Sequence, residues 1–378
     1  MTDNRPYKLC FIFALILFLG LGLALVMPWL ASSQSQAAQS DIEVLTSIID
    51  LPERGNGIGV ITSPEARTKL APTYVTIYVA TTGTGSSGLS WTDAFTNVQD
   101  ALAVAVETSE IWIAEGVYYP DQGGGQIDNA VTSTFIMTDG VTLFGGFDTS
   151  DEFLTDRDWE NNVTVLSGDI DGDDTTDTNG MVTDTLNING NNAYHVVTGS
   201  GVTGTAVLDG FTITAGQANG SNTPNYYGGG FFCDGSGSGN ECSPSLSNVT
   251  FSGNTAKWAG GAMYNDGHNG GISSPNLSDV IFSGNSAGVS GGAMYNDGDN
   301  GGTSSPTLRD VTFSGNLSFT NGGAMYNDGL NGSSSPILTN VTFSGNWADI
   351  GGAMYNDGYN GSSSPTLGNV IFSGNSAD

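Results

Sequence analysis

The densest group of potential metal ligands in the chain is an acidic stretch, Asp169-Ile-Asp171-Gly-Asp173-Asp174-Thr-Thr-Asp177. Carboxylate oxygens at alternate positions are ligands of the kind that Ca²⁺ prefers. The stretch departs from an EF-hand loop, because its sixth position is Asp174 instead of glycine and its twelfth is Gly180 instead of glutamate. The sequence therefore offers a candidate Ca²⁺ site and no other cofactor, and the alternative is an acidic loop without an ion. The candidate ligands are Asp169, Asp171, Asp173 and Asp177.

A second set of candidates recurs in the phrase Gly-Gly-Ala-Met-Tyr-Asn-Asp-Gly, which starts at Gly260, Gly291, Gly322 and Gly351. If the methionines point inward, the alternation of a strand places the tyrosines outward. We expect them to form a surface column that either recognises a glycan or protein, or stabilises neighbouring strands as a stack. The tyrosines are Tyr264, Tyr295, Tyr326 and Tyr355.

The same phrase supplies a column of carboxylates. Unit charges about 4.8 Å apart repel by about 0.9 kcal/mol in water. We expect the side chains to splay into solvent and to bond locally in turns, with bridging cations such as Ca²⁺ as the alternative. The aspartates are Asp266, Asp297, Asp328 and Asp357.

Two cysteines lie nine residues apart, at Cys233 and Cys242, and the third, Cys10, precedes an apolar run. Outside the cell such a pair is expected to form a disulfide across one loop, and two free thiols are the alternative. No histidine stands nearby at ligand spacing, so a zinc site is not indicated.

Residues for polysaccharide cleavage are not gathered at one place in the sequence. A lyase would need a lysine or arginine base, and the regular repeats offer only Lys257 and Arg309, at unequal repeat positions. Asp173-Asp174 has no basic partner nearby, and His195 stands in a strand-like run. We therefore expect a protein without catalytic activity. A polysaccharide lyase or glycosidase, with its site within residues 140–240, is the alternative.

The elements that position these residues follow from a repeat. Phe-Ser-Gly-Asn recurs at spacings of 31, 31, 30 and 29 residues, and Val280-x-Phe282 has the period of a strand. Two or three short strands per repeat, without a helix, predict an all-β fold, a parallel β-helix whose equivalent residues stack. The expected columns are Phe251, Phe282, Phe313, Phe343 and Phe372, and Asn254, Asn285, Asn316, Asn346 and Asn375.

Upstream of the repeats, Ala94, Val98, Ala101 and Ala105 recur at helical spacing, and Ser90 or Thr92 is the expected N-cap. A helix at the start of a strand-only chain is the expected cap of a solenoid's open end. We divide this part of the chain into the cap and first strands at 73–134, irregular coils at 135–242 and regular repeats at 243–378.

The first residues are of another kind. Arg5 and Lys8 precede an apolar run to about Leu30, so residues 1–38 are expected to be a signal peptide, with a retained membrane anchor as the alternative. Residues 39–72 are expected to be a linker. The net charge of −30 repels nucleic acid and anionic lipid, which excludes nucleic acid as a partner.

Phe-x-x-Asn alternating with Gly-Gly-Ala-Met at about thirty residues resembles the repeat of chlamydial polymorphic outer-membrane proteins. The matches are the five phenylalanine–asparagine pairs given above and the segments Gly260–Met263, Gly291–Met294, Gly322–Met325 and Gly351–Met354. Residues 76–227 look like the N-terminal part of pectate-lyase-like β-helix proteins. The resemblance implies a right-handed parallel β-helix at the cell surface, with adhesion as its role. Together with the scattered catalytic candidates, it leads us to expect a non-enzymatic module, secreted or at the cell surface, with the outer membrane as one location.

Expected partners are an extracellular protein or glycan surface. Membrane contact is expected only through the N-terminal segment or a C-terminal anchor that this sequence does not contain. The chain stops at Asp378, where the next Gly-Gly-Ala is due, and we interpret this end as a truncation.

Overall fold

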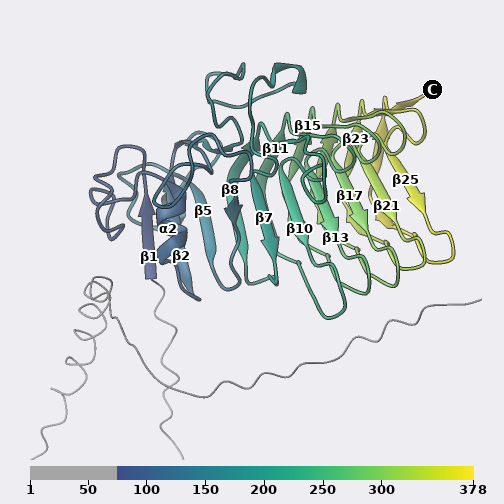
Figure 1. The fold of residues 1–378 in the computed structure, drawn as a ribbon, viewed down its shortest axis with the longest axis horizontal. Coiled ribbons are helices and arrows are strands. Elements are labelled where there is room, and N and C mark those ends of the chain that lie inside the picture. The colour runs from purple at the N-terminus through teal and green to yellow at the C-terminus, as the bar shows by residue number, and fades with distance from the viewer. Residues whose placement is uncertain (1–74) are drawn as a thin grey trace, which may run out of the picture. The chain divides into compact units, whose positions relative to one another are not determined.

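The computed structural model describes residues 75–378, which form a parallel β-solenoid (Figure 1). Every pairing between named strands in this range is parallel. The predicted all-β parallel solenoid is confirmed. The expected signal peptide at 1–38 and linker at 39–72 lie outside the described residues.

The strands form three sheets, which make up the faces of the solenoid. The first sheet contains β1 (Val75–Val79), β2 (Ser109–Ala114), β3 (Gly116–Tyr118), β5 (Thr142–Phe147), β6 (Thr164–Ser167), β8 (Val207–Thr214), β11 (Ser245–Ser252), β14 (Asn276–Ser278), β15 (Ile281–Ser283), β18 (Thr307–Arg309), β19 (Thr312–Ser314), β22 (Ile337–Thr339), β23 (Thr342–Ser344), β26 (Thr366–Gly368) and β27 (Ile371–Ser373). The second contains β4 (Phe135–Ile136), β7 (Val197–Ser200), β10 (Phe231–Asp234), β13 (Met263–Asp266), β17 (Met294–Asp297), β21 (Met325–Asp328) and β25 (Met354–Asp357). The third contains β9 (Gln217–Ala218), β12 (Thr255–Ala256), β16 (Ser286–Ala287), β20 (Leu317–Ser318), β24 (Trp347–Ala348) and β28 (Ser376–Ala377).

One regular coil contains β14 and β15 on the first sheet, β16 on the third and β17 on the second. Asp279 breaks the first face into two strands because its backbone takes a φ of 57°, which favours asparagine, aspartate and glycine. The Asn296-Asp297 pair forms the end of β17. Asn296 points into the core, where its amide donates to Asn327 Oδ1 at 2.7 Å.

Two side-chain columns run through the regular coils. The phenylalanine rings stack at centroid distances of 4.7–5.0 Å and interplanar angles of 3–7°. In the asparagine column, Asn285 Nδ2 donates to Asn316 Oδ1 at 3.0 Å, and the Asn285 backbone N–H donates to the same oxygen at 3.1 Å. Buried amides are thus paired from coil to coil, and each hydrogen bond contributes about 1 kcal/mol.

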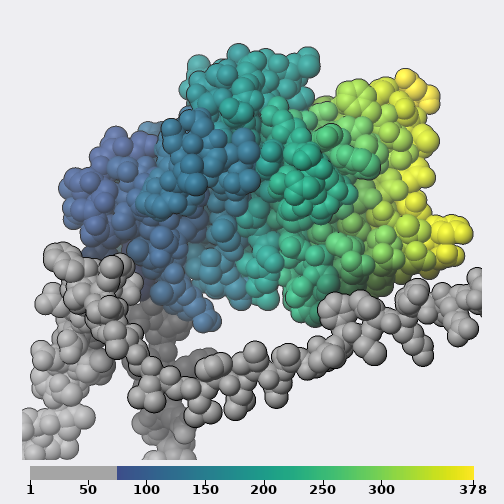
Figure 2. Space-filling model, viewed as in Figure 1, coloured from purple at the N-terminus to yellow at the C-terminus, as the bar shows by residue number. Residues whose placement is uncertain are grey.

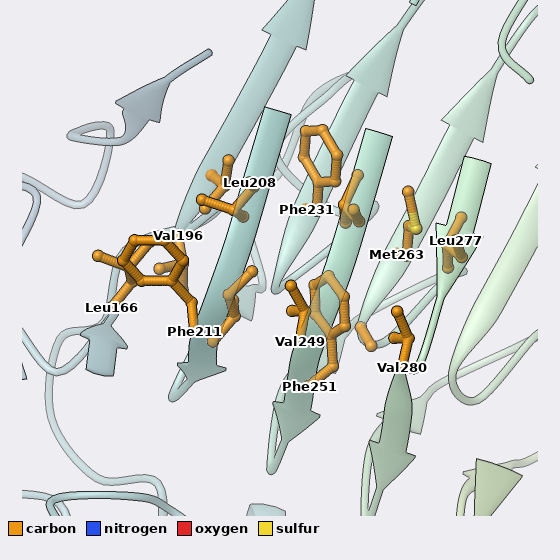
Figure 3. Packing of buried hydrophobic residues seen from close by; sticks show 14 of the residues in the cluster. Leu166, Val196, Leu208, Phe211, Phe231, Val249, Phe251, Met263, Leu277 and Val280 are labelled. Atoms are coloured by element: carbon orange, nitrogen blue, oxygen red, sulfur yellow. The ribbon is translucent and has the colours of Figure 1, made fainter. Parts of the chain in front are cut away.

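The core lies between the three sheets as one apolar cluster that extends from Ile77 to Phe343. Figure 3 shows part of it, with Phe211, Phe251 and Met263 directed inward from different strands. The inward-facing methionines Met263, Met294 and Met325 are fully buried. Burial of a side chain of this size stabilises the fold by about 1.5–3 kcal/mol.

The cap helix is α2 (Val98–Val104), and its residues Val98 and Ala101 join the core. It begins later than the sequence predicts. Its N-cap is Asn97, whose side chain accepts a hydrogen bond from the Asp100 N–H at 2.9 Å. Ser90, one of the two expected caps, instead accepts from Asp93 N in the preceding bend.

Two inserts interrupt the early coils. The first, between β5 and β6, contains the 3₁₀ turn η1 (Leu154–Asp156). The second, between β6 and β7, contains η2 (Thr185–Asn187). In Figure 2 a teal lobe of this part of the chain projects from the solenoid.

Candidate functional site

A groove of about 720 Å³ lies on the outer side of the first sheet, next to both inserts. Four coils contribute to its floor through β8, β11, β15 and β19, so the groove extends along the solenoid axis. Strand register places Thr250 between Thr212 and Ile281, and Thr312 follows on the next coil. The lining residues are Trp159, Glu160, Val163, Thr164, Asn179, Met181, Gly210, Phe211, Thr212, Asn248, Thr250, Asp279, Ile281, Asp310 and Thr312.

The first insert brings an aromatic side chain, Trp159, to the groove, where it is 38% exposed. Arg157 supports it, with the guanidinium carbon 5.0 Å from the Trp159 ring centroid. Arg157 is itself fixed by a 2.8 Å ion pair with Asp209, and its charge is thereby neutralised. Gly146 lets this segment approach the sheet, because a Cβ there would fall 2.7 Å from Trp159 Cα. The indole is therefore held in place by its surroundings.

The second insert brings Met181 and Asn179 to the groove. Their neighbour Val182 is fully buried, and its N–H donates to Thr214 Oγ1 at 2.9 Å. Ser252 Oγ donates to the Val182 carbonyl at 2.9 Å, which ties the insert to two coils. Asp177, an expected Ca²⁺ ligand, accepts from the backbone of Met181 at 3.0 Å instead. It therefore holds the groove lining in position.

The charges of the groove are of one sign. Glu160, Asp279 and Asp310 line it, and among residues 75–378 no histidine, lysine or arginine does so. Arg309 lies at the rim, with Nε 3.7 Å from Asp310 Oδ2 and a side chain 63% exposed. Such a surface can accept hydrogen bonds and contact apolar faces. It lacks the basic residue that a lyase needs to remove a proton.

The expected surface column of tyrosines is in part buried, which corrects the prediction. Tyr264 and Tyr326 are only 3% and 8% exposed, and Tyr295 and Tyr355 are partly buried. The rings stack face to face at 4.8–5.1 Å, so each covers its neighbour. The column is a stack between neighbouring strands, as in the second alternative of the sequence analysis.

The aspartate column does not splay into solvent, because the tyrosine hydroxyls bond it. Tyr264 Oη donates to Asp297 Oδ2 at 2.6 Å, and Tyr295 Oη donates to Asp328 Oδ2 at 2.7 Å. Tyr326 repeats this contact with Asp357 at 3.4 Å. Burial raises the pKa of Asp297 to about 6, against the lowering effect of the Tyr264 hydrogen bond.

The start of the aspartate column carries the one group in the regular coils that combines histidine with acids, Asp266, His268 and Asp297. The His268 imidazole contacts the buried Asp266 carboxylate through Nδ1. Burial opposes the imidazolium form, but the hydrogen bond to Asp266 and its charge outweigh this effect and raise the pKa of His268. His268 is therefore a local partner for the charge of the Asp266 carboxylate.

In the second insert, Asp169, Asp173 and Asp174 have carboxylate oxygens within 4.8 Å of one another. Asp177, a candidate Ca²⁺ ligand, is not part of this group. Asp171 lies beside Asp173, and a Cβ at Gly190 would be 2.5 Å from an oxygen of each. Burial raises the pKa of Asp174 to about 6. The backbone N–H groups of Asn189 and Asn191 donate to this cluster, so peptide groups offset part of its charge.

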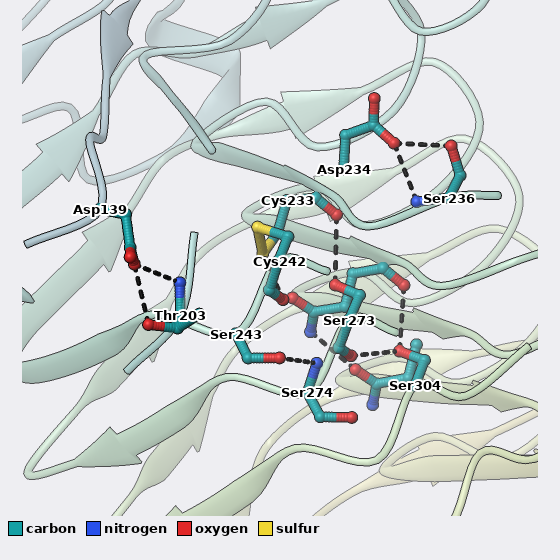
Figure 4. Close-up of a disulfide and its surroundings, with 12 residues drawn as sticks. Asp139, Thr203, Cys233, Asp234, Ser236, Cys242, Ser243, Ser273, Ser274 and Ser304 are labelled. Atoms are coloured by element: carbon teal, nitrogen blue, oxygen red, sulfur yellow. Dashed lines mark hydrogen bonds between the residues drawn. A yellow bond between two sulfur atoms is a disulfide. The ribbon is translucent and has the colours of Figure 1, made fainter. Parts of the chain in front are cut away.

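Cys233 and Cys242 form a disulfide with both side chains fully buried (Figure 4). It joins the end of β10 to the strand-like segment that leads into β11. Beside it, Ser273 Oγ donates to the Cys233 carbonyl at 3.2 Å and Ser304 Oγ to the Ser273 carbonyl at 3.1 Å. The bridge thus closes the loop between β10 and β11, and the serine hydrogen bonds connect this coil to the next ones.

His195, which the sequence places in a strand-like run, is buried outside the groove, and its Nδ1 lies 2.9 Å from the Gly228 carbonyl. Burial lowers its pKa to about 4, so the imidazole is neutral at pH 7. Its ring packs against Phe232. His195 therefore packs in the protein interior, away from the acidic side chains of the groove.

The fold and the repeated sequence motifs together define the class of protein. It is a parallel β-solenoid whose regular coils contain the Phe-x-x-Asn and Gly-Gly-Ala motifs. The family model of the Chlamydia polymorphic membrane protein repeat matches residues 248–275 and 279–297. These coils therefore carry the repeat that the sequence resembles. Searches of curated proteins and of solved structures gave no significant match. Within residues 75–378, no helix has the length and apolarity to cross a membrane.

Proposed function

We propose that the chain is a non-enzymatic recognition module, secreted or at the cell surface, that serves adhesion through the axial groove. The observation that carries this proposal is the make-up of the groove. Trp159, three carboxylates and the floor threonines Thr212, Thr250 and Thr312 line it, and no lysine, arginine or histidine among residues 75–378 does so. Such a lining supports binding more than catalysis, because acid–base cleavage needs groups of unlike proton affinity at one place.

A location outside the cytoplasm is supported by two observations. The matched repeat is named for a family of membrane proteins, and an oxidised cysteine pair fits an oxidising compartment. The proposed partner is an extracellular glycan or protein surface, and the outer membrane is one proposed location.

Retention of the purified full chain on surfaces coated with extracellular-matrix proteins, on glycan arrays and on intact cells tests this function. We expect saturable retention on at least one of these surfaces, and no release of reducing or unsaturated sugars from polysaccharides. Retention on none of them would contradict the adhesive role. Release of products that stops in Asp279→Asn or Asp310→Asn would instead support a polysaccharide-cleaving enzyme.

A further inference from the structure

We propose that the axial groove binds an uncharged linear glycan whose chain lies along the solenoid axis. The inference rests on the proposed recognition function and names the class of ligand. It begins with charge. The groove presents Glu160, Asp279 and Asp310 and no basic lining residue, so uronate, sulfate or phosphate groups would be repelled there. A neutral sugar can donate its hydroxyl groups to these carboxylates at no such cost.

The spacing of the floor favours a sugar chain over a peptide. Equivalent side chains on successive coils recur at the coil spacing, which is 4.7–5.0 Å in the phenylalanine stack. An extended peptide presents side chains to one surface only every second residue, about 6.6–6.8 Å apart. Successive pyranose rings of an extended chain have a repeat close to the coil spacing. A sugar chain can therefore meet Thr250, Ile281 and Thr312 in turn.

An apolar face for the sugar ring is present as well. Trp159 is held by Arg157 and exposes part of its indole, and Met181 is held by its buried neighbour Val182. A large aromatic side chain provides a broad apolar contact surface, and a ligand groove of about 300–1,000 Å³ is of ordinary size. The groove therefore combines one stacking surface, a hydroxyl row and three acceptors.

Isothermal titration calorimetry with the full chain tests the inference. The neutral probes are cello-, xylo-, manno- and N-acetylglucosamine oligosaccharides. The comparison probes are oligogalacturonate and oligolysine. We expect at least one neutral probe to bind and oligogalacturonate not to bind at physiological ionic strength. Trp159→Ala should lower the affinity for that neutral probe by about tenfold or more. Trp258→Ala is the matched control, because Trp258 is 49% exposed and lies outside the groove.

A second variant guards against loss of fold in the first. Asp279→Asn combined with Asp310→Asn should weaken the neutral probe several-fold and reduce the discrimination against oligogalacturonate, with an unchanged melting temperature. Binding of oligogalacturonate in preference to all neutral probes, binding of oligolysine alone, or no neutral binding would each overturn the inference. If Trp159→Ala abolishes neutral-glycan binding while surface retention persists, the ligand class stands and adhesion uses another surface. Retention that persists without any glycan binding refutes the ligand class and leaves the proposed function intact.

Discussion

In the tyrosine–aspartate column, every aspartate after Asp266 accepts a hydrogen bond from the tyrosine hydroxyl of the preceding coil. The contacts run from Tyr264 to Asp297 and from Tyr295 to Asp328. They provide polar hydrogens where stacked carboxylates would otherwise only repel one another. The same hydroxyls are shielded by the ring stack, and burial raises the pKa of Tyr264 and Tyr295 well above the usual value. This column therefore has a role in stability, and the proposed recognition is assigned to the groove instead.

Replacement of one hydroxyl tests this role. Tyr295→Phe removes the 2.7 Å donor to Asp328 and keeps the ring stack. We expect the free energy of unfolding to fall by about 1–3 kcal/mol, because the hydrogen bond is to a charged group. Urea unfolding followed by circular dichroism measures it. Tyr355→Phe is the control, since the Tyr355 hydroxyl has no side-chain partner among residues 75–378. An equal loss in both variants would contradict the assignment.

The raised carboxyl pKa values predict an unusual pH dependence. Asp174 and Asp297 have folded-state pKa values of about 6, above the ordinary 3.8, because of burial. The folded state therefore binds protons more tightly than the unfolded chain between these values, and stability rises as pH falls through 6. We expect a higher melting temperature at about pH 5 than at about pH 7.5.

Single substitutions separate the contribution of Asp174 and Asp297 to this pH dependence from that of the other titratable groups. Asp174→Asn and Asp297→Asn should each reduce the difference in melting temperature between the two pH values. Asp139→Asn should leave it unchanged, because hydrogen bonds from Thr203 lower the pKa of Asp139, which then titrates below this range. A melting temperature that rises with pH over this interval would show that other groups dominate.

At the scale of elements, the close approach of successive coils depends on glycines of two kinds. Gly292 has an ordinary φ, but a Cβ there would collide with the backbone carbonyls of Gly323 and Leu317 on the next coil. Gly301 has a φ of 79° and nothing within 4 Å of the Cβ position. The first glycine is required by neighbouring backbone, and the second only by its own conformation.

These two positions give a matched pair of substitutions. Gly301→Ala should cost about 1 kcal/mol, which is the price of the left-handed conformation. Gly292→Ala should cost more than 3 kcal/mol, because carbonyl groups on two segments must move. Chemical denaturation of both variants measures the difference. An equal loss of unfolding free energy in both variants would mean that neighbouring coils can move apart at Gly292 without a free-energy cost.

The repeat made the element order and the stacked columns predictable, since identical residues at 29–31-residue spacing can align in only one register. The groove was not predictable from the same signal. Its floor residues Thr250 and Thr312 are ordinary outward positions of a strand, and Trp159 and Met181 come from inserts without periodicity. The available signal was indirect. Glycines at 145–146 and at 210 mark where the insert packs on the sheet.

At the scale of the whole molecule, the two halves contribute differently. The irregular coils supply Trp159, Glu160, Asn179, Met181 and the floor at β8, and the regular coils supply the floor from β11 onward. The candidate site thus lies where irregular coils meet regular ones. The net charge of −30 over 378 residues surrounds it with an acidic surface. A cationic molecule would be attracted to the whole protein, whereas the proposed uncharged ligand would be selected by the groove itself.

The same charge predicts a salt effect on folding. Self-repulsion among 38 acidic and 8 basic residues destabilises the compact state, and mobile ions screen it. We expect the melting temperature to rise as sodium chloride increases from about 10 mM to about 300 mM, a range over which the screening length falls below about 10 Å. Sucrose at matched osmolality is the control, and a flat or falling salt response would contradict the expectation.

The one-directional amide ladder has a consequence for how such a protein can change in length. Each Asn donates to the next coil and accepts from the previous one, so any coil can be exchanged for its neighbour without a mismatch. Removal of residues 313–342 would place Phe343 directly after Thr312, with every column restored and the solenoid shorter by one coil spacing. The groove ends at Thr312, so its lining would survive that deletion. The length of the solenoid and the lining of the groove are therefore set by different stretches of the chain, and each can vary while the other stays fixed.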